Sequence, residues 1–125
     1  MDTEALLPWL TEAANQSGCV LTVCTGSALL GLTGILDGHD ATTNKALFEW
    51  VAEKRSEVRW QPRARWVKDG RFYTSSGVSA GIDMSLAAIA DMLGLHKAEE
   101  VAKGCEYEWH RDPSWDPFAR THGLV

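Results

Sequence analysis

One short stretch of the sequence, Cys19–Ser27, limits the possible folds more than any other part. Residues Cys19–Val23 (CVLTV) form an apolar run with β-branched side chains, which is typical of a buried strand. The small residues Cys24–Ser27 follow at once, and Ala28–Leu32 then resumes a helical pattern. A strand that turns directly into a helix is the unit from which α/β proteins with parallel sheets are built.

The rest of the sequence alternates between helical and strand patterns in the same way. The patterns predict helices over Leu6–Gln16, Ala46–Arg55, Val78–Leu93 and Ala98–Trp109, and short strands over Val58–Trp60, Arg65–Val67 and Phe72–Thr74. The last fourteen residues (DPSWDPFARTHGLV) are predicted to be irregular. The dipeptide Asp69-Gly70 lies between two β-prone runs and predicts a β-hairpin. We therefore expect an α/β fold with a mostly parallel sheet and a β-hairpin insert.

The longest predicted helix carries the clearest apolar stripe in the sequence. Its members recur at helical spacing and are Val78, Ile82, Leu86, Ile89 and Leu93. A stripe of this width normally faces the core. We expect it to pack against the sheet.

Composition narrows the classes of function. The chain has 125 residues, so we expect one domain over residues 1–125. Its net charge of −5 argues against sequence-independent nucleic-acid binding, and no apolar run approaches the roughly 20 residues of a membrane span. The three cysteines, Cys19, Cys24 and Cys105, are too few for a disulfide scaffold. We expect free thiols, a cytoplasmic location, and neither nucleic acid nor membrane as a partner.

Cys24 is the strongest candidate for chemistry. A nucleophile between a strand and a helix, followed two positions later by a small residue such as Gly26, fits a nucleophile elbow. The sharp turn exposes the side chain, and the amides that follow favour a thiolate and can stabilise an oxyanion. The alternative is that Cys24 is a small, inert core residue.

A second motif, Gly77–Gly81, matches the G-x-S-x-G pattern of serine hydrolases, with Ser79 at its centre. We favour a simpler role for Ser79 at the start of a helix, because an α/β-hydrolase needs far more than 125 residues. The four histidines do not cluster, so we expect no metal site and no cofactor.

Taken together, several segments resemble the DJ-1/PfpI superfamily, in the branch with isonitrile hydratases and the amidase-like domains of AraC-type regulators. The segments are Val23–Leu30 (VCTGSALL), Gly34–Gly38 (GILDG), Ala41–Thr43 (ATT), Ser75–Met84 (SSGVSAGIDM), Glu106–Trp109 and Asp116–Phe118. The resemblance implies a flavodoxin-like three-layer sandwich, usually a homodimer. It also implies that Cys24 is the nucleophile and that Thr25 takes part in catalysis. Residues expected to form the oxyanion site or pocket are Gly26, Asn44, Ser76 and Gly77.

The sequence departs from the family pattern in two places. Many relatives have His where Asn44 follows Ala-Thr-Thr, and an amide cannot act as a base at neutral pH. The resemblance also begins partway through the family domain, which implies an N-terminally incomplete sandwich without the family's first strand–helix unit, its carboxylate and its glycine-rich loop. The Cys19–Val23 strand should then present an apolar edge, and the chain should be marginally stable unless it dimerises or pairs with another segment.

Three functions remain open from the sequence. The first is a cofactor-free hydratase or amidase-like reaction at Cys24, acting on a small-molecule substrate. The second is a sensor in which an oxidant modifies Cys24 or the pocket binds a ligand. The third is an inactive remnant of the family.

Overall fold

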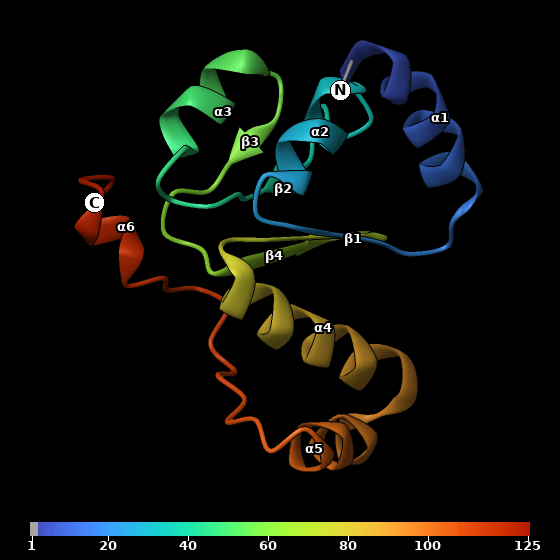
Figure 1. Ribbon diagram of the computed structural model, residues 1–125, viewed down its shortest axis with the longest axis vertical. Coiled ribbons are helices and arrows are strands. Elements are labelled where there is room, and N and C mark those ends of the chain that lie inside the picture. Colours follow the sequence, from blue (N-terminus) through green and yellow to red (C-terminus); the bar gives the residue numbers. More distant parts are fainter. Residues whose placement is uncertain (1–2) are drawn as a thin grey trace.

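A three-stranded sheet lies between two layers of helices in the computed structural model, which describes residues 3–125 (Figure 1). The order of strands across this sheet is β1 (Val20–Val23), β5 (Phe72–Ser75) and β4 (Trp66–Asp69). A second sheet pairs β2 (Asp40–Ala41) with β3 (Arg59–Trp60). The helices are α1 (Thr3–Gln16), α2 (Gly26–Leu32), α3 (Phe48–Lys54), α4 (Val78–Leu93), α5 (Leu95–Gly104) and α6 (Phe118–Thr121). Figure 1 shows α1 and α2 on one side of the main sheet and α4 on the other.

Strand β5 is the centre of the main sheet. It runs parallel to β1, with Val23 opposite Ser75, and antiparallel to β4, with Asp69 opposite Phe72. The predicted hairpin is confirmed, and Gly70 takes a positive φ of 61° in its turn. The second strand of the hairpin also pairs directly with β1, so the hairpin is part of the main sheet. The two parallel pairs and the covering helices confirm the α/β class.

The core has one apolar cluster on each side of this sheet. Neighbouring residues of β5 divide between them, because successive side chains of a strand point to opposite faces. Phe72 packs with Leu30, Leu36 and Val58 on the side of α2. On the side of α4, Tyr73 belongs to a cluster with Trp66, Met84 and Ala88.

The predicted core face of α4 is wrong for most of its length. Val78 is 74% exposed and Leu93 is 67% exposed, although Leu86 is buried. The buried residues of the helix are instead Ala80, Gly81, Asp83, Met84, Leu86 and Ala88, and Gly81 makes a close contact with β1. A Cβ atom added there would lie 2.6 Å from Cγ1 of Val23. Helix α4 therefore lies directly on β1, with Gly81 at the contact. In this orientation both ends of the predicted apolar stripe, Val78 and Leu93, are exposed to solvent.

Other boundaries also differ from the prediction. Helix α5 ends at Gly104 rather than at Trp109, and Glu106 follows with a φ of 52°. The backbone then turns back, and the Trp109 indole N–H donates to the Asp83 carbonyl. Strand β2 and helix α6, which lies in the tail predicted to be irregular, were not predicted.

Strand β1 is an outer strand of the main sheet in the described part of the chain. Two of its four residues, Leu21 and Val23, are each 39% exposed, and none of the four is charged. This confirms the apolar edge expected for the Cys19–Val23 strand. An uncharged outer strand is a template for pairing with another strand.

The contact between α4 and β1 can be tested at Gly81. We expect Gly81→Ala to lower the free energy of unfolding by roughly 1–3 kcal/mol, because the added methyl group meets a stiff β-branched side chain. Denaturant unfolding followed by circular dichroism measures the change. Gly104→Ala is the matched control, since no atom lies within 4 Å of its added Cβ. A Gly81→Ala variant within about 0.5 kcal/mol of wild type would contradict the packing.

Candidate functional site

Cys24 occupies a sharp bend between β1 and α2. Its φ is 58°, and among the described residues only Glu106 shares a positive φ without being glycine. Such a conformation is sterically costly for a residue with a Cβ and is typical of a nucleophile elbow. The tight turn expected between the strand and the helix is therefore present, with Cys24 at its most strained position.

Hydrogen bonds hold both the backbone N–H group and the carbonyl group of Cys24. The N–H of Cys24 donates to the carbonyl oxygens of Ser76 at 2.9 Å and Ser75 at 3.2 Å, just past and at the end of β5. The carbonyl of Cys24 accepts from the Ser27 amide at 3.2 Å and from the Thr43 hydroxyl at 2.8 Å. These bonds fix the conformation of Cys24 from three separate parts of the chain.

Cys24 is half-buried rather than fully buried. Among the described residues no side chain forms a hydrogen bond with its sulfur. The amides of Thr25 and Gly26 likewise have no acceptor in this part of the chain, and Thr25 is exposed. Gly26 is not required for steric reasons, since an added Cβ would lie at an ordinary 3.8 Å from Cβ of Thr22. The bend thus presents a thiol and two free N–H donors on one turn.

Asn44 is linked to the elbow through its neighbour. The Thr43 hydroxyl lies 2.8 Å from the Cys24 carbonyl oxygen and 3.2 Å from Oδ1 of Asn44. The structure therefore links Asn44 through Thr43 to the backbone of Cys24. Among residues 3–125, no imidazole or carboxylate forms a hydrogen bond with Cys24.

Ser76 and Gly77 have different places. Ser76 is buried, and its carbonyl is one of the two acceptors of the Cys24 amide. Gly77 precedes the first turn of α4 and lines a separate cavity of about 160 Å³ with Arg65 and Phe118. This cavity includes no residue of the elbow, so the structure joins only Ser76 directly to Cys24.

Lys45 is the functional-site neighbour that sequence reasoning missed. Its side chain is buried, and its ammonium group donates to Oγ1 of Thr42 at 2.7 Å and to the carbonyl of Thr43 at 3.3 Å. Burial lowers the pKa of Lys45 to about 8, and the negative charge of Asp116 opposes part of this shift. A lysine beside a predicted surface helix is ordinarily solvated, so no local pattern marked it.

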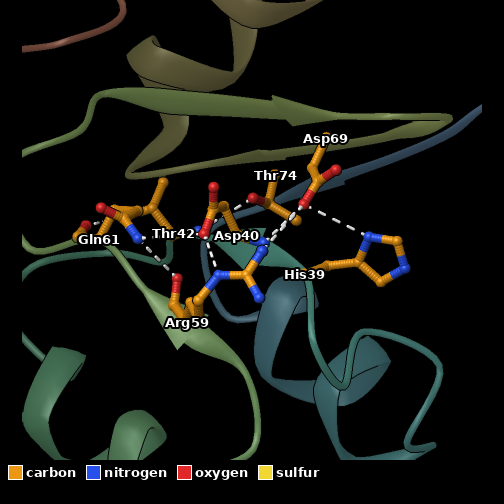
Figure 2. A network of polar contacts seen from close by, with 7 residues as sticks. All are labelled: His39, Asp40, Thr42, Arg59, Gln61, Asp69 and Thr74. Atoms are coloured by element: carbon orange, nitrogen blue, oxygen red, sulfur yellow. Dashed lines mark hydrogen bonds and ion pairs between the residues drawn. The ribbon is translucent and has the colours of Figure 1, made fainter.

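A larger polar network holds the segment that contains Asp40 and Thr42 (Figure 2). The Thr42 amide donates to the Thr74 hydroxyl at 2.9 Å, and the Thr42 hydroxyl donates to the Gln61 carbonyl at 2.8 Å. Two residues earlier, the Asp40 amide donates to Oδ2 of Asp69 at 2.7 Å. This bond holds the pKa of Asp69 below its ordinary value, and His39 lowers it further. The network ties β2 and β3 to the main sheet, which fixes where residues 42–44 meet the elbow.

The serine motif does not form a catalytic site. Ser79 is exposed in the first turn of α4, and no sharp bend at the residue itself presents it. Asp83, the acid four residues after Ser79, accepts two hydrogen bonds from Arg65 at 2.9 and 2.8 Å and one from the backbone amide of His110. Its carboxylate therefore serves a buried ion pair. No cluster of metal-ligating side chains is found within the described residues.

Comparison with known proteins identifies the family. A model of the DJ-1/PfpI family matches residues 1–91. The chain belongs to the DJ-1/PfpI family. A curated relative, isonitrile hydratase from Pseudomonas putida, is 34% identical over 107 residues, which cover 86% of this chain and 46% of that protein. The HTH-type transcriptional regulator GbdR from Pseudomonas aeruginosa is 30% identical over 106 residues, covering 85% of this chain and 29% of the regulator.

Solved structures agree on the fold of this DJ-1/PfpI protein. A ThiJ/PfpI family protein from Pseudomonas syringae superposes with a TM-score of 0.71 at 28% identity, covering 82% of this chain and 41% of that one. DJ-1beta from Drosophila melanogaster gives a TM-score of 0.70 at 20% identity, covering 86% and 56%. The chain thus spans about half the length of its structural relatives or less. Among the described helices, none has the length and apolar character needed to cross a membrane.

The buried amine of Lys45 makes a pH-dependent contribution to stability. Because its pKa is about 8 in the folded state and 10.5 in the unfolded state, the unfolded chain binds more protons between these values. We expect the free energy of unfolding to rise by about 1–2 kcal/mol between pH 7.5 and 9.5, relative to a Lys45→Met variant. Urea unfolding of both proteins at the two pH values measures this difference.

The hydrogen bonds that Lys45→Met removes change the free energy of unfolding by a similar amount at both pH values. Their loss therefore does not produce a difference between pH 7.5 and pH 9.5. Lys103→Met, which removes an exposed amine on α5, is the control and should show no such difference. Parallel pH profiles of wild type and Lys45→Met would contradict the buried, partly deprotonated amine.

Proposed function

We propose that Cys24 is the nucleophile of a cofactor-free hydratase reaction and that isonitriles are its class of substrate. The observation that carries the proposal is the φ of 58° at Cys24, a half-buried residue held in a fixed bend. The isonitrile hydratase from Pseudomonas putida, 34% identical over 86% of this chain, supports the choice of substrate.

The reaction needs one thiol and one water molecule. The sulfur of Cys24 bonds to the terminal carbon of the isonitrile, and the same carbon gains the proton of the thiol, which gives a thioimidate. The oxygen of water then bonds to this carbon while the nitrogen takes one proton of that water. The carbon–sulfur bond breaks, and the sulfur takes the second proton of the water. The product is an N-substituted formamide, so the substrate gains one water molecule and no electrons are transferred.

The neighbouring groups have distinct roles in this proposal. The backbone N–H groups of Thr25 and Gly26 donate hydrogen bonds to the substrate. They stabilise the negative charge that develops when sulfur or water adds to the isonitrile carbon. Asn44 supplies a polar side chain beside the elbow, joined to it through Thr43. The carbonyl oxygen of Ser76 positions Cys24 by accepting a hydrogen bond from its backbone N–H group. None of these groups is a base, so bulk water relays the protons between sulfur and substrate.

Turnover of cyclohexyl isonitrile tests the reaction. We expect wild type to form the formamide, and Cys24→Ala to lose at least about a thousandfold in rate, the scale expected when an attacking nucleophile is removed. Proton NMR of the formyl hydrogen measures the product. Cys105→Ala is the matched control because it removes an exposed thiol far along the chain, at the end of α5. Equal turnover by wild type and Cys24→Ala would refute the proposal.

A redox sensor is the second candidate, favoured by the lack of a side-chain hydrogen bond to the Cys24 sulfur among the described residues. Hydrogen peroxide would oxidise the thiol to a sulfenic acid and be reduced to water, which needs no base on the protein. Trapping of a sulfenate on Cys24, in a protein that does not turn over the isonitrile, would replace the hydratase with this function.

We also propose a second copy of this chain as a partner, paired through the outer edge of β1. The uncharged strand and the exposed Leu21 and Val23 support this arrangement. The midpoint of urea unfolding should then rise with protein concentration for wild type, and Leu21→Lys should reduce that dependence by placing a charge on the edge. A wild-type protein that sediments as a monomer and unfolds at a concentration-independent midpoint would rule out the pairing.

A further inference from the structure

An apolar groove lies beside the elbow, between α2 and α3. Its volume is about 610 Å³, within the range of small-molecule sites. Thr25, the residue after the proposed nucleophile, lies at its border. The walls are apolar, with Leu29 and Leu32 from α2, and Leu47 and Trp50 from the region of α3.

The groove is preorganised by Trp60. The indole N–H of Trp60 donates to the carbonyl of Arg55 at 2.9 Å, which satisfies its polar atom. The six-membered ring of the same side chain lies close to α2 at Gly31, where an added Cβ would lie 3.2 Å from Cζ2 of Trp60. This side chain is therefore held by a hydrogen bond and by contact with α2. A ligand would meet a formed surface and would lose little affinity to ordering it.

One positive charge is available at the rim. Two cationic side chains border the groove, Lys54 and Arg55. Arg55 is already engaged, since it donates to both carboxylate oxygens of Asp37 and lies 3.7 Å from Glu57. Lys54 has no carboxylate partner among residues 3–125, and its ammonium group lies 5.1 Å from the centre of the Trp50 ring. The groove thus combines apolar walls with one uncompensated cation.

We propose that this groove binds a small aromatic carboxylate, with its ring against Trp50 and the leucine side chains and its carboxylate at Lys54. The apolar walls favour a ring, and the charge at the rim selects an anion over a neutral ring of the same shape. The inference goes beyond the hydratase proposal because binding requires no reaction at Cys24. A bound ring would extend toward Thr25, so the groove and the elbow share one border.

Isothermal titration calorimetry of the whole chain with 2-naphthoate and 2-naphthamide tests this assignment. Wild type should bind the carboxylate roughly threefold to fivefold more tightly than the amide, the scale of a partly exposed ion pair. Lys54→Gln should abolish that preference, and Lys54→Arg should keep it. Trp50→Ala should weaken both ligands by roughly tenfold or more, because it removes the aromatic wall.

The controls separate this proposal from the preceding one. Lys103→Gln removes a distant exposed charge and should leave the preference unchanged, and Cys24→Ala should bind naphthoate as wild type does. Circular dichroism confirms that each variant is folded. The proposal is overturned if folded wild type binds neither ligand at millimolar concentration, or if it binds both equally. It is also overturned if Lys54→Gln and Lys103→Gln behave alike.

Discussion

The backbone of Cys24 is the point at which three separate parts of the chain meet. Its N–H group donates to the end of β5, and its carbonyl accepts from the start of α2 and from Thr43. A positive φ at a residue with a Cβ is unfavourable by roughly 1–2 kcal/mol, so the conformation persists only where surrounding hydrogen bonds offset that cost. The hydrogen bonds that join the end of β5 to Cys24 thus also hold the strained backbone of this residue.

The packing of α4 determines which surface of the sheet is left open. Gly81 lets the helix backbone approach Val23 so closely that no larger residue fits between them. This contact holds α4 over β1 and β5 and leaves Ile82 of α4 43% exposed. The outer edge of β1 has no partner strand among the described residues, and such an edge is a site at which another strand can add. The bend at Cys24 thus follows a strand whose outer edge has no partner strand among the described residues.

Buried polar groups, rather than apolar side chains, position the segment opposite the elbow. Thr42, Thr43 and Lys45 are all almost fully buried, and each has its polar atoms satisfied by other parts of the chain. Satisfied networks of this kind specify one arrangement, because any shift leaves a buried donor or acceptor unpaired. Residues 42–45 therefore serve as a rigid support for Asn44 and the Cys24 carbonyl. The neighbouring groove between α2 and α3 is by contrast apolar and open, so binding and positioning are carried by different surfaces.

The sequence by itself determined the strand–bend–helix unit at Cys24, the hairpin at Asp69-Gly70, the α/β class and the family, because each depends on residues close together along the chain. The resemblance to the family, rather than residue type alone, predicted that Cys24, Thr25 and Asn44 belong to one site. Only the tertiary structure decided which side of α4 is buried, since an apolar stripe reports hydrophobicity and not the close approach that Gly81 permits. It alone revealed Lys45 as a buried amine and β5 as the centre of the sheet, because both depend on contacts between residues far apart in sequence. Local patterns fix local conformation, whereas burial and charge compensation are set by what the folded chain brings from a distance.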